Sequence, residues 1–298
     1  MKGLSLSFKN TFPMRTQLGP VGITFLSLSD TKLVAWYDFS DSTTMWENAA
    51  GSDPAEDGDR ILKVDNKAYD GLGASSTSLN TAIIQPSLTT SRQPVWTAPS
   101  GLDPGFLSFT GTEWLGSSVS VGNASTGRMG GVTLNHENQT ISFVMKNTNV
   151  TESTDHQYYA YQDQGRKISA IGIESTDDQM HYWPEYGTNN VDSGAAFTTN
   201  LDFWTIVMGN ATISGADARV IKIYKNGVDL MATTVSYAAY NKDLTVNHAS
   251  VTFDLGRSPG SANQFVGRMY EFLQWDKALS DVQLDQLNTY YGVKYGIS

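Results

Sequence analysis

Short runs of alternating apolar and polar residues recur along the whole chain and restrict what it can fold into. Each run is bounded by Gly, Asn, Asp or Ser, a pattern typical of half-buried β-strands. Valine, isoleucine and aromatic residues fill the runs, as a pleated surface favours. The runs that we expect to be strands are 33–38, 105–111, 139–146, 156–162, 167–174, 202–210, 219–235, 249–256 and 265–276.

One of these runs contains a hairpin signal. Asn226-Gly227 stands between two alternating segments in KIYKNGVDL. Both residue types accept the positive φ angles of a type I′ turn, so we expect two antiparallel strands joined at this point.

Only the end of the chain has a helical pattern. Ser280 precedes DVQLDQLNTYYGVKY and can cap a helix that has Gln283 in its first turn. We expect Gly292 to end this helix. Many strands and one short terminal helix predict an all-β fold, a two-sheet antiparallel sandwich. The apolar residues that can line one face of the helix are Val282, Leu284, Leu287, Tyr290 and Tyr291.

Charge and composition exclude several partners. The net charge of −10 and the pI near 4.8 argue against nucleic acid, because binding to phosphates needs a basic surface. No apolar run approaches the roughly 18 residues of a membrane-spanning helix, so no membrane partner is expected. The absence of cysteine rules out disulfides and thiolate metal sites.

The 298 residues can form one large β domain. No linker divides residues 33–298, which we interpret as a single domain. In residues 1–32 the apolar stretches are interrupted by Pro13, Arg15 and Pro20. We expect this segment to be an arm for docking or oligomerisation, and a signal peptide is the alternative.

Both ends of the proposed domain contain familiar motifs. The run GRMYEFLQWDKALSDVQLDQLNTYYGVKYGI, 267–297, resembles the closing strand and helix of concanavalin A-like, laminin-G-type lectin/glucanase jelly rolls. The opening resembles the version of this domain found in tailed-phage virion proteins. Its matching motifs are Ala35-Trp36-Tyr37-Asp38, Ser40-Asp41, Gly58-Asp59, Arg92-Gln93-Pro94 and Phe109-Thr110-Gly111.

The resemblance implies a two-sheet jelly roll with a saccharide-binding surface on a virus particle. A capsid decoration, head-fibre or tail-fibre protein would fit it. The expected partners are other virion proteins, contacted through the arm, and a host-surface glycan, with the chain acting as a homo-oligomer. The expected location is the virion surface, and a secreted or cell-surface protein is the alternative.

Catalysis is not expected from the sequence. Glucanases of this fold place Glu-x-Asp-x-Glu on one strand, which directs the acids to one face. The corresponding strand here, RMYEFLQWD, carries Glu271 alone, with Asp276 at its end. We interpret Glu271 as a structural hydrogen-bonding residue. We therefore expect a non-enzymatic protein. The alternatives are a purely structural decoration protein without a sugar site and a polysaccharide depolymerase.

A loop rich in carboxylates follows the first strand. Asp53, Asp57 and Asp59, with Gly58 for a turn, are candidate ligands for Ca²⁺, which binds six to eight oxygens. The EF-hand pattern is absent, and a solvated loop over 41–60 is the simpler interpretation. No other cofactor is expected, because the four histidines share no metal-binding spacing.

Aromatic residues concentrate in two segments, 156–162 and 175–190. Consecutive aromatics in a strand cannot all face the core, so some must be exposed or covered by a loop or another subunit. Exposed rings among Asn, Asp and Gln are typical of sugar sites, although packing in the core or between subunits is the alternative. The candidate carbohydrate-binding residues are Tyr159, Tyr161, Tyr182, Trp183 and Tyr186.

Overall fold

In the residues that it describes, the computed structural model consists mainly of β-strands and ends in a helix. It describes residues 33–67, 83–84, 90–116, 128–129, 132–133, 138–148, 156–163, 166–173, 179–183, 191–196, 198–213, 216–230, 237–238, 251–257, 265–275 and 277–297. The expected arm, 1–32, lies outside these residues.

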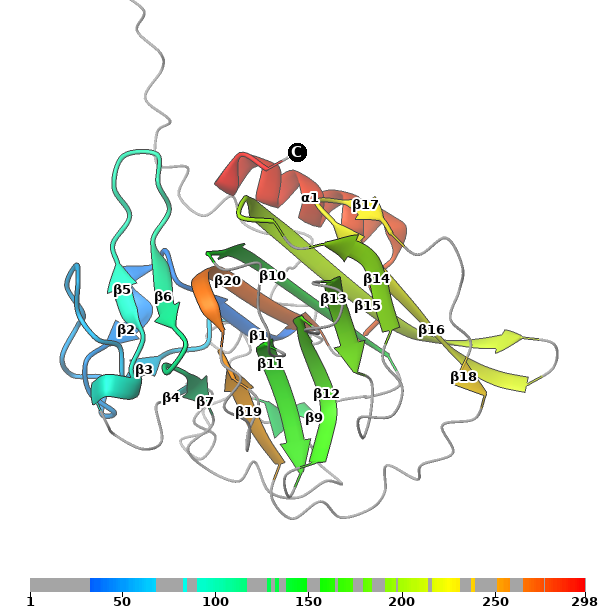
Figure 1. Ribbon diagram of the computed structural model, residues 1–298, viewed down its shortest axis with the longest axis horizontal. Helices are drawn as coiled ribbons and strands as arrows, with labels where there is room; N and C mark the ends of the chain where they lie inside the picture. Colours follow the sequence, from blue (N-terminus) through cyan, green and yellow to red (C-terminus); the bar gives the residue numbers. More distant parts are fainter. Residues whose placement is uncertain are drawn as a thin grey trace, which may run out of the picture.

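Two antiparallel sheets face each other (Figure 1). In each sheet, strands from distant parts of the sequence are neighbours. Sheet A has the order β17 (Val228–Asp229), β16 (Ala216–Lys225), β15 (Leu201–Ile213), β10 (Gln139–Asn147), β20 (Val266–Trp275), β6 (Phe106–Thr110) and β5 (Val95–Thr97), with β1 (Leu33–Asp38) paired to β20 and β18 (Tyr237–Ala238) paired to β16. Sheet B has the order β14 (Val191–Ala196), β13 (Gln179–Trp183), β12 (Arg166–Ile173), β11 (His156–Asp163), β19 (Val251–Leu255), β7 (Leu115–Gly116), β4 (Ile83–Ile84), β3 (Lys63–Val64) and β2 (Met45–Trp46).

Short elements complete the fold. A separate hairpin joins β8 (Arg128–Met129) to β9 (Val132–Thr133), and 3₁₀ turns occupy Ser42–Thr44 and Thr90–Arg92. The expected all-β, two-sheet antiparallel sandwich with a short C-terminal helix is confirmed. No helix in the part of the chain that the structure describes is long and apolar enough to cross a membrane.

Strand β10 shows why the alternating pattern produces this sandwich. Ile141, Phe143 and Met145 point into the core between the two sheets. Val144 points the other way, into a second apolar cluster beneath the helix. Because successive side chains alternate in direction, one strand serves two apolar layers. Sheet A is therefore buried on both faces along its centre.

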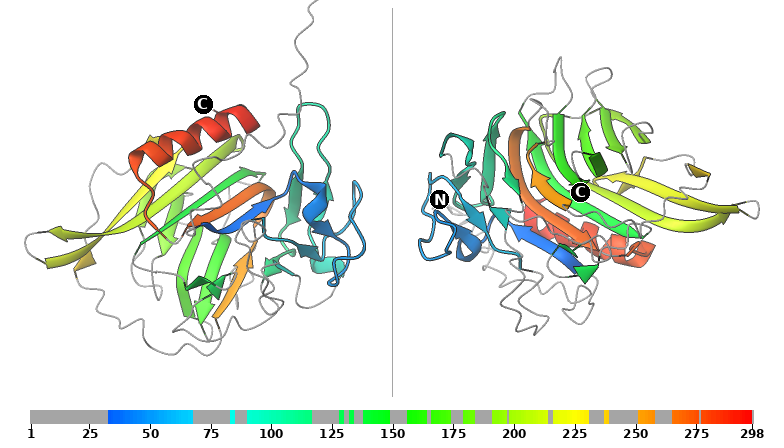
Figure 2. Two further views of the ribbon diagram at one scale, coloured as in Figure 1. Left: turned by 180° about the vertical axis from the view of Figure 1, so that it is seen from behind. Right: turned by 90° about the horizontal axis from the view of Figure 1, so that it is seen from below.

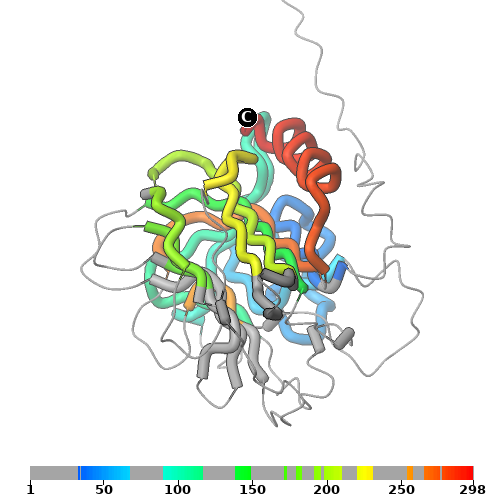
Figure 3. Tube along the Cα trace, turned by 90° about the vertical axis from the view of Figure 1, so that its right-hand side faces the viewer, coloured from blue at the N-terminus to red at the C-terminus, as the bar shows by residue number. Residues whose placement is uncertain are grey.

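Helix α1 (Asp281–Tyr295) covers the outer face of sheet A (Figures 2 and 3). Leu284, Leu287 and Tyr291 are buried against the sheet. Two predictions for this helix were wrong. Val282 is 67% exposed instead of facing the sheet, and the helix continues through Gly292 to a left-handed cap at Gly296, with φ of 70°. Either glycine could end the helix by its sequence, and the left-handed backbone occurs at the second.

The turn predictions had mixed outcomes. The hairpin at Asn226-Gly227 is confirmed, with φ of 49° and 80° at its two residues. The loop 41–60, expected to be solvated, contributes to the core. Met45 and Ala55 from this segment are buried there, and β2 pairs with β3.

Replacing Ser280 by alanine tests the start of the helix. Ser280 and Gln283 form a capping box, in which each side chain bonds to the other residue's backbone N–H. Because the substitution leaves first-turn donors unpaired, we expect it to lower the free energy of unfolding by about 1 kcal/mol. Urea denaturation measures the loss. Ser280→Asp, which retains a capping oxygen, is expected to keep most of the stability, and equal losses in the two variants would contradict this role.

Candidate functional site

One of the predicted sugar-binding aromatic residues, Tyr182, is a core residue. Tyr182 is fully buried between the sheets, where its hydroxyl accepts a hydrogen bond from Gln139 Nε2 at 2.8 Å and donates to Met208 Sδ at 3.9 Å. A sugar ring cannot stack on a side chain in that position. Its assignment as a carbohydrate-binding residue is therefore corrected to a core residue.

The other aromatic candidates are placed only in part. Tyr159 and Tyr161 lie in β11, opposite Leu255 and Phe253 of β19. Trp183 is the last residue of β13, and Tyr186 lies outside the described residues. Their role in sugar binding stays a prediction.

The candidate calcium ligands do not converge. Asp57 Oδ1 accepts a hydrogen bond from the backbone N–H of Ala98 at 2.8 Å, and Asp59 Oδ2 accepts one from Glu56 at 2.6 Å. Asp53 is exposed. Nowhere in the ranges given above do three or more His, Cys, Asp or Glu side chains form a group that could hold a metal ion. Asp59 therefore stabilises the loop locally, and Asp57 connects it to the segment that follows β5.

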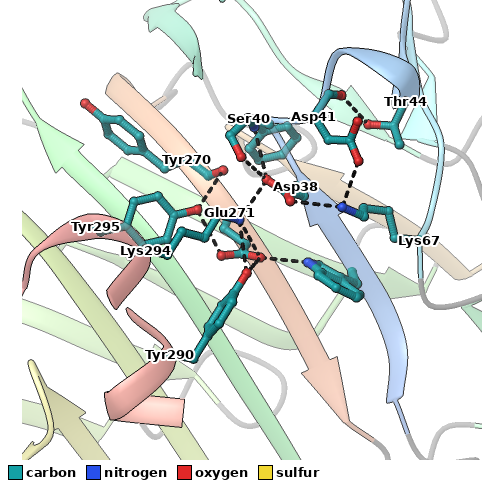
Figure 4. Close-up of polar contacts among 12 residues, drawn as sticks. Asp38, Ser40, Asp41, Thr44, Lys67, Tyr270, Glu271, Tyr290, Lys294 and Tyr295 are labelled. Carbon is teal, nitrogen blue, oxygen red and sulfur yellow. Dashed lines mark hydrogen bonds and ion pairs between the residues drawn. The ribbon is translucent and has the colours of Figure 1, made fainter. Parts of the chain in front are cut away.

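A buried carboxylate lies where α1 meets the paired strands β1 and β20 (Figure 4). Glu271 is fully buried, and its Oε1 accepts hydrogen bonds from Trp36 Nε1 and Tyr290 Oη, both at 2.7 Å. Its Oε2 accepts one from Tyr295 Oη at 2.9 Å. This arrangement agrees with the interpretation of Glu271 as a structural hydrogen-bonding residue.

Asp38 lies opposite Glu271 in the strand pairing, and Lys294 connects the two carboxylates. Lys294 Nζ is 2.9 Å from Asp38 Oδ1 and 3.2 Å from Glu271 Oε1. Lys67 Nζ is 3.0 Å from Asp38 Oδ2 and 2.8 Å from Asp41 Oδ2. Burial alone would raise the pKa of Asp38. The positive charges of Lys294 and Lys67 have the larger effect and hold the pKa of this carboxyl well below its usual range.

The pKa of Glu271 is shifted in the opposite direction to that of Asp38. Burial raises its pKa, and the nearby charge of Asp38 adds to the rise, while Lys294 opposes it. Glycoside hydrolysis needs two carboxyl groups that both reach the substrate. Two tyrosines, a tryptophan and a lysine surround Glu271 and leave no room for a substrate. Glu271 and Asp38 therefore hold α1 against sheet A and do not form an open acid–base site.

A second buried carboxylate, Asp254, lies in sheet B, at the junction of β19 and β7. Asp254 is 2% exposed. The next residue, Leu255, points into the core, and successive side chains of a strand face opposite sides. Asp254 pairs with Gly116 on one side and Ala160 on the other. Its side chain is thus directed away from the sandwich core.

Arg257 and Trp114 lie beside this carboxylate. Arg257 Nε is 3.7 Å from Asp254 Oδ2, and its guanidinium carbon is 3.0 Å from the centre of the Trp114 ring. Asp254 Oδ2, Arg257 Nε and Trp114 Nε1 are all buried and all lack a hydrogen bond. Burial raises the pKa of Asp254 to about 7, with Arg257 opposing the rise. Burial, and the neighbouring charge of Arg92, lower the pKa of Arg257.

Two local features, the hydrogen bonds of Glu113 and the backbone turn at Gly256, position Asp254, Arg257 and Trp114. Glu113 accepts hydrogen bonds from the backbone N–H groups of Thr110 and Thr112, which fixes the turn that leads into Trp114. Gly256 has a φ of 88°, and a Cβ there would lie 2.7 Å from the Phe109 ring. The chain can therefore turn directly after β19 and bring Arg257 back over Trp114.

Sequence reasoning missed this cluster. Asp254 is one polar residue in an alternating strand, and no spacing links it to Trp114. Only the pairing of β19 with β7 brings the two segments together.

Comparison with known proteins adds information on the fold. No protein-family model matches the chain, and no curated protein matches its sequence. A solved arabinofuranosidase complexed with arabinofuranosyl-alpha-1,2-xylobiose has a TM-score of 0.60 at 10% identity, covering 92% of this chain and 65% of that one. A Trypanosoma rangeli sialidase has a TM-score of 0.50 at 10% identity, covering 89% of this chain. The match spans 33% of the sialidase.

These neighbours correct one prediction. The expectation of a non-enzymatic protein rested on the missing Glu-x-Asp-x-Glu run. It was wrong, because chains that share this fold include glycoside hydrolases, an arabinofuranosidase and a sialidase. The missing run therefore does not separate this chain from enzymes. None of the neighbours named here is described as part of a virus particle.

Proposed function

We propose that the chain is a carbohydrate-binding β-sandwich. The observation that carries this proposal is the fold shared, over 92% of the chain, with an arabinofuranosidase solved with a bound oligosaccharide. At 10% identity the likeness concerns the fold, so the step from fold to sugar is an analogy.

The sequence resemblance extends this proposal. It adds a host-surface glycan as the target, a place on the virion surface, and residues 1–32 as the segment that docks the domain or joins copies into an oligomer. Many copies on one particle would turn weak single sites into firm attachment. This setting rests on the resemblance alone.

A glycan array tests the proposal. We expect the purified chain to bind a defined group of saccharides, weakly at each single site. The same sugars are incubated with the chain, and released products are measured, so that binding and hydrolysis are scored separately. Binding repeated in chelator decides whether a metal takes part. If no saccharide on the array is bound or cleaved in either condition, the proposal is wrong.

A further inference from the structure

The cluster of Asp254, Arg257 and Trp114 holds polar atoms that the protein itself does not satisfy. Asp254 Oδ2, Arg257 Nε and Trp114 Nε1 are buried without a hydrogen bond. Buried polar groups in folded proteins are nearly always paired, and leaving one unpaired is unfavourable. Three such atoms in one contact group indicate that a partner from solution completes them.

The spacing indicates the size of that partner. The 3.7 Å between Asp254 Oδ2 and Arg257 Nε is too long for a direct hydrogen bond. A single hydroxyl oxygen beside both atoms can donate to the carboxylate and accept from the Nε–H group. Trp114 Nε1 offers a second donor, which a neighbouring hydroxyl can use.

The charges indicate the chemistry of the partner. An anion would meet the carboxylate of Asp254, and a cation would meet the guanidinium of Arg257. A neutral group that both donates and accepts suits the mixture of one acceptor and two donors. Adjacent hydroxyls of a sugar have this property.

The cluster also has a route to solvent. The side chain of Arg257 is 21% exposed, and Arg92, which lowers the pKa of Arg257 by its charge, lies at the surface. Asp254 is directed away from the core, on the outer face of sheet B. Asp254 is 2% and Trp114 5% exposed, so a ligand would reach the carboxylate when the partly exposed side chain of Arg257 moves aside.

We propose that Asp254, Arg257 and Trp114 form a subsite for adjacent hydroxyl groups of a neutral saccharide, in which Asp254 accepts and the other two donate hydrogen bonds. This inference rests on the proposed carbohydrate binding and gives it a location. It places the site at the start of β7 and the end of β19, and not on Tyr182.

Three substitutions test the subsite in the full-length chain. Asp254→Asn keeps the shape but removes the charge, Arg257→Met keeps the stem over the ring, and Trp114→Phe removes only the N–H donor. Asp229→Asn is the control, because Asp229 is a 40% exposed carboxylate paired with Lys222 on the other sheet. Titration uses the saccharide that the wild-type chain binds best on the array. Circular dichroism verifies that each variant is folded.

We expect Asp254→Asn and Arg257→Met to weaken binding by about tenfold or more, Trp114→Phe by a few-fold, and the control to leave it unchanged. If the wild type binds and all three variants bind equally well, this inference is wrong and the proposed function stands. If the wild type binds nothing, the proposed function fails and the subsite with it. A crystal soaked in the bound sugar that shows only an ordered water between Asp254 and Arg257 would also overturn the subsite.

Discussion

Replacing Glu271 by alanine is expected to lower the free energy of unfolding by about 3–5 kcal/mol, since it removes one partner from a buried charge network. The substitution leaves the donors of Trp36, Tyr290 and Tyr295 without their acceptor. It also leaves Lys294 with Asp38 as its remaining carboxylate partner in the network. Because the two tyrosines belong to α1, the loss should loosen the helix from sheet A.

Urea denaturation at neutral pH measures this effect through the midpoint and slope of the transition. Glu271→Gln, which keeps an acceptor oxygen, should lose less and serves as a folded variant if alanine prevents folding. The matched control is Asp229→Ala, because its exposed pair with Lys222 should contribute no more than about 1 kcal/mol. A loss below about 1 kcal/mol for Glu271→Ala would show that the network contributes little to stability.

The parts of the fold that follow from local chemistry could be predicted. Alternation located β1, β10 and β20, the Asn226-Gly227 pair located a hairpin, and Ser280 located the start of α1. Each of these sequence patterns lies within a few residues of the strand, turn or helix end that it predicts. The end of α1 was missed because the sequence offers two glycines, and packing against sheet A decides how far the helix continues.

The candidate site depends on contacts between distant segments, which a single sequence does not record. Tyr182 lies in a polar, aromatic stretch, and which face of the sheet it takes depends on how its strand pairs with its neighbour. The pairing of β13 with β12 sets Tyr182 opposite the buried Ile171, and this places it in the core. The cluster around Asp254 likewise exists only because β19 lies beside β7.

Asp254 should make stability depend on pH. Its pKa is raised from an ordinary value of 3.8 to about 7 in the folded chain. Below pH 3.8 the carboxyl is protonated in both states, so it has no effect. As pH rises toward 7, the unfolded chain releases the proton and the folded chain retains it, so the folded state is progressively destabilised. Above pH 7 the penalty is complete, at roughly 4 kcal/mol as an upper bound.

Asp254→Asn is therefore expected to stabilise the protein by about 2 kcal/mol at pH 8 and to have little effect at pH 4, since it removes the charge but keeps a buried polar group. Removing one member of a buried ion pair usually destabilises a protein. Here the raised pKa means that the attraction of Arg257 does not compensate for burial, and Arg257, being partly exposed, can turn to solvent.

Urea denaturation of both proteins at pH 4, 6 and 8 measures this difference, with Asp229→Asn as an exposed control that should show no such trend. A variant that is less stable than wild type at pH 8 would mean that the pair with Arg257 dominates. If Asp254→Asn is more stable at pH 8 and binds sugar less well, Asp254 destabilises the fold and contributes to binding. A buried charge that weakens the fold and strengthens binding is the combination expected of a functional site.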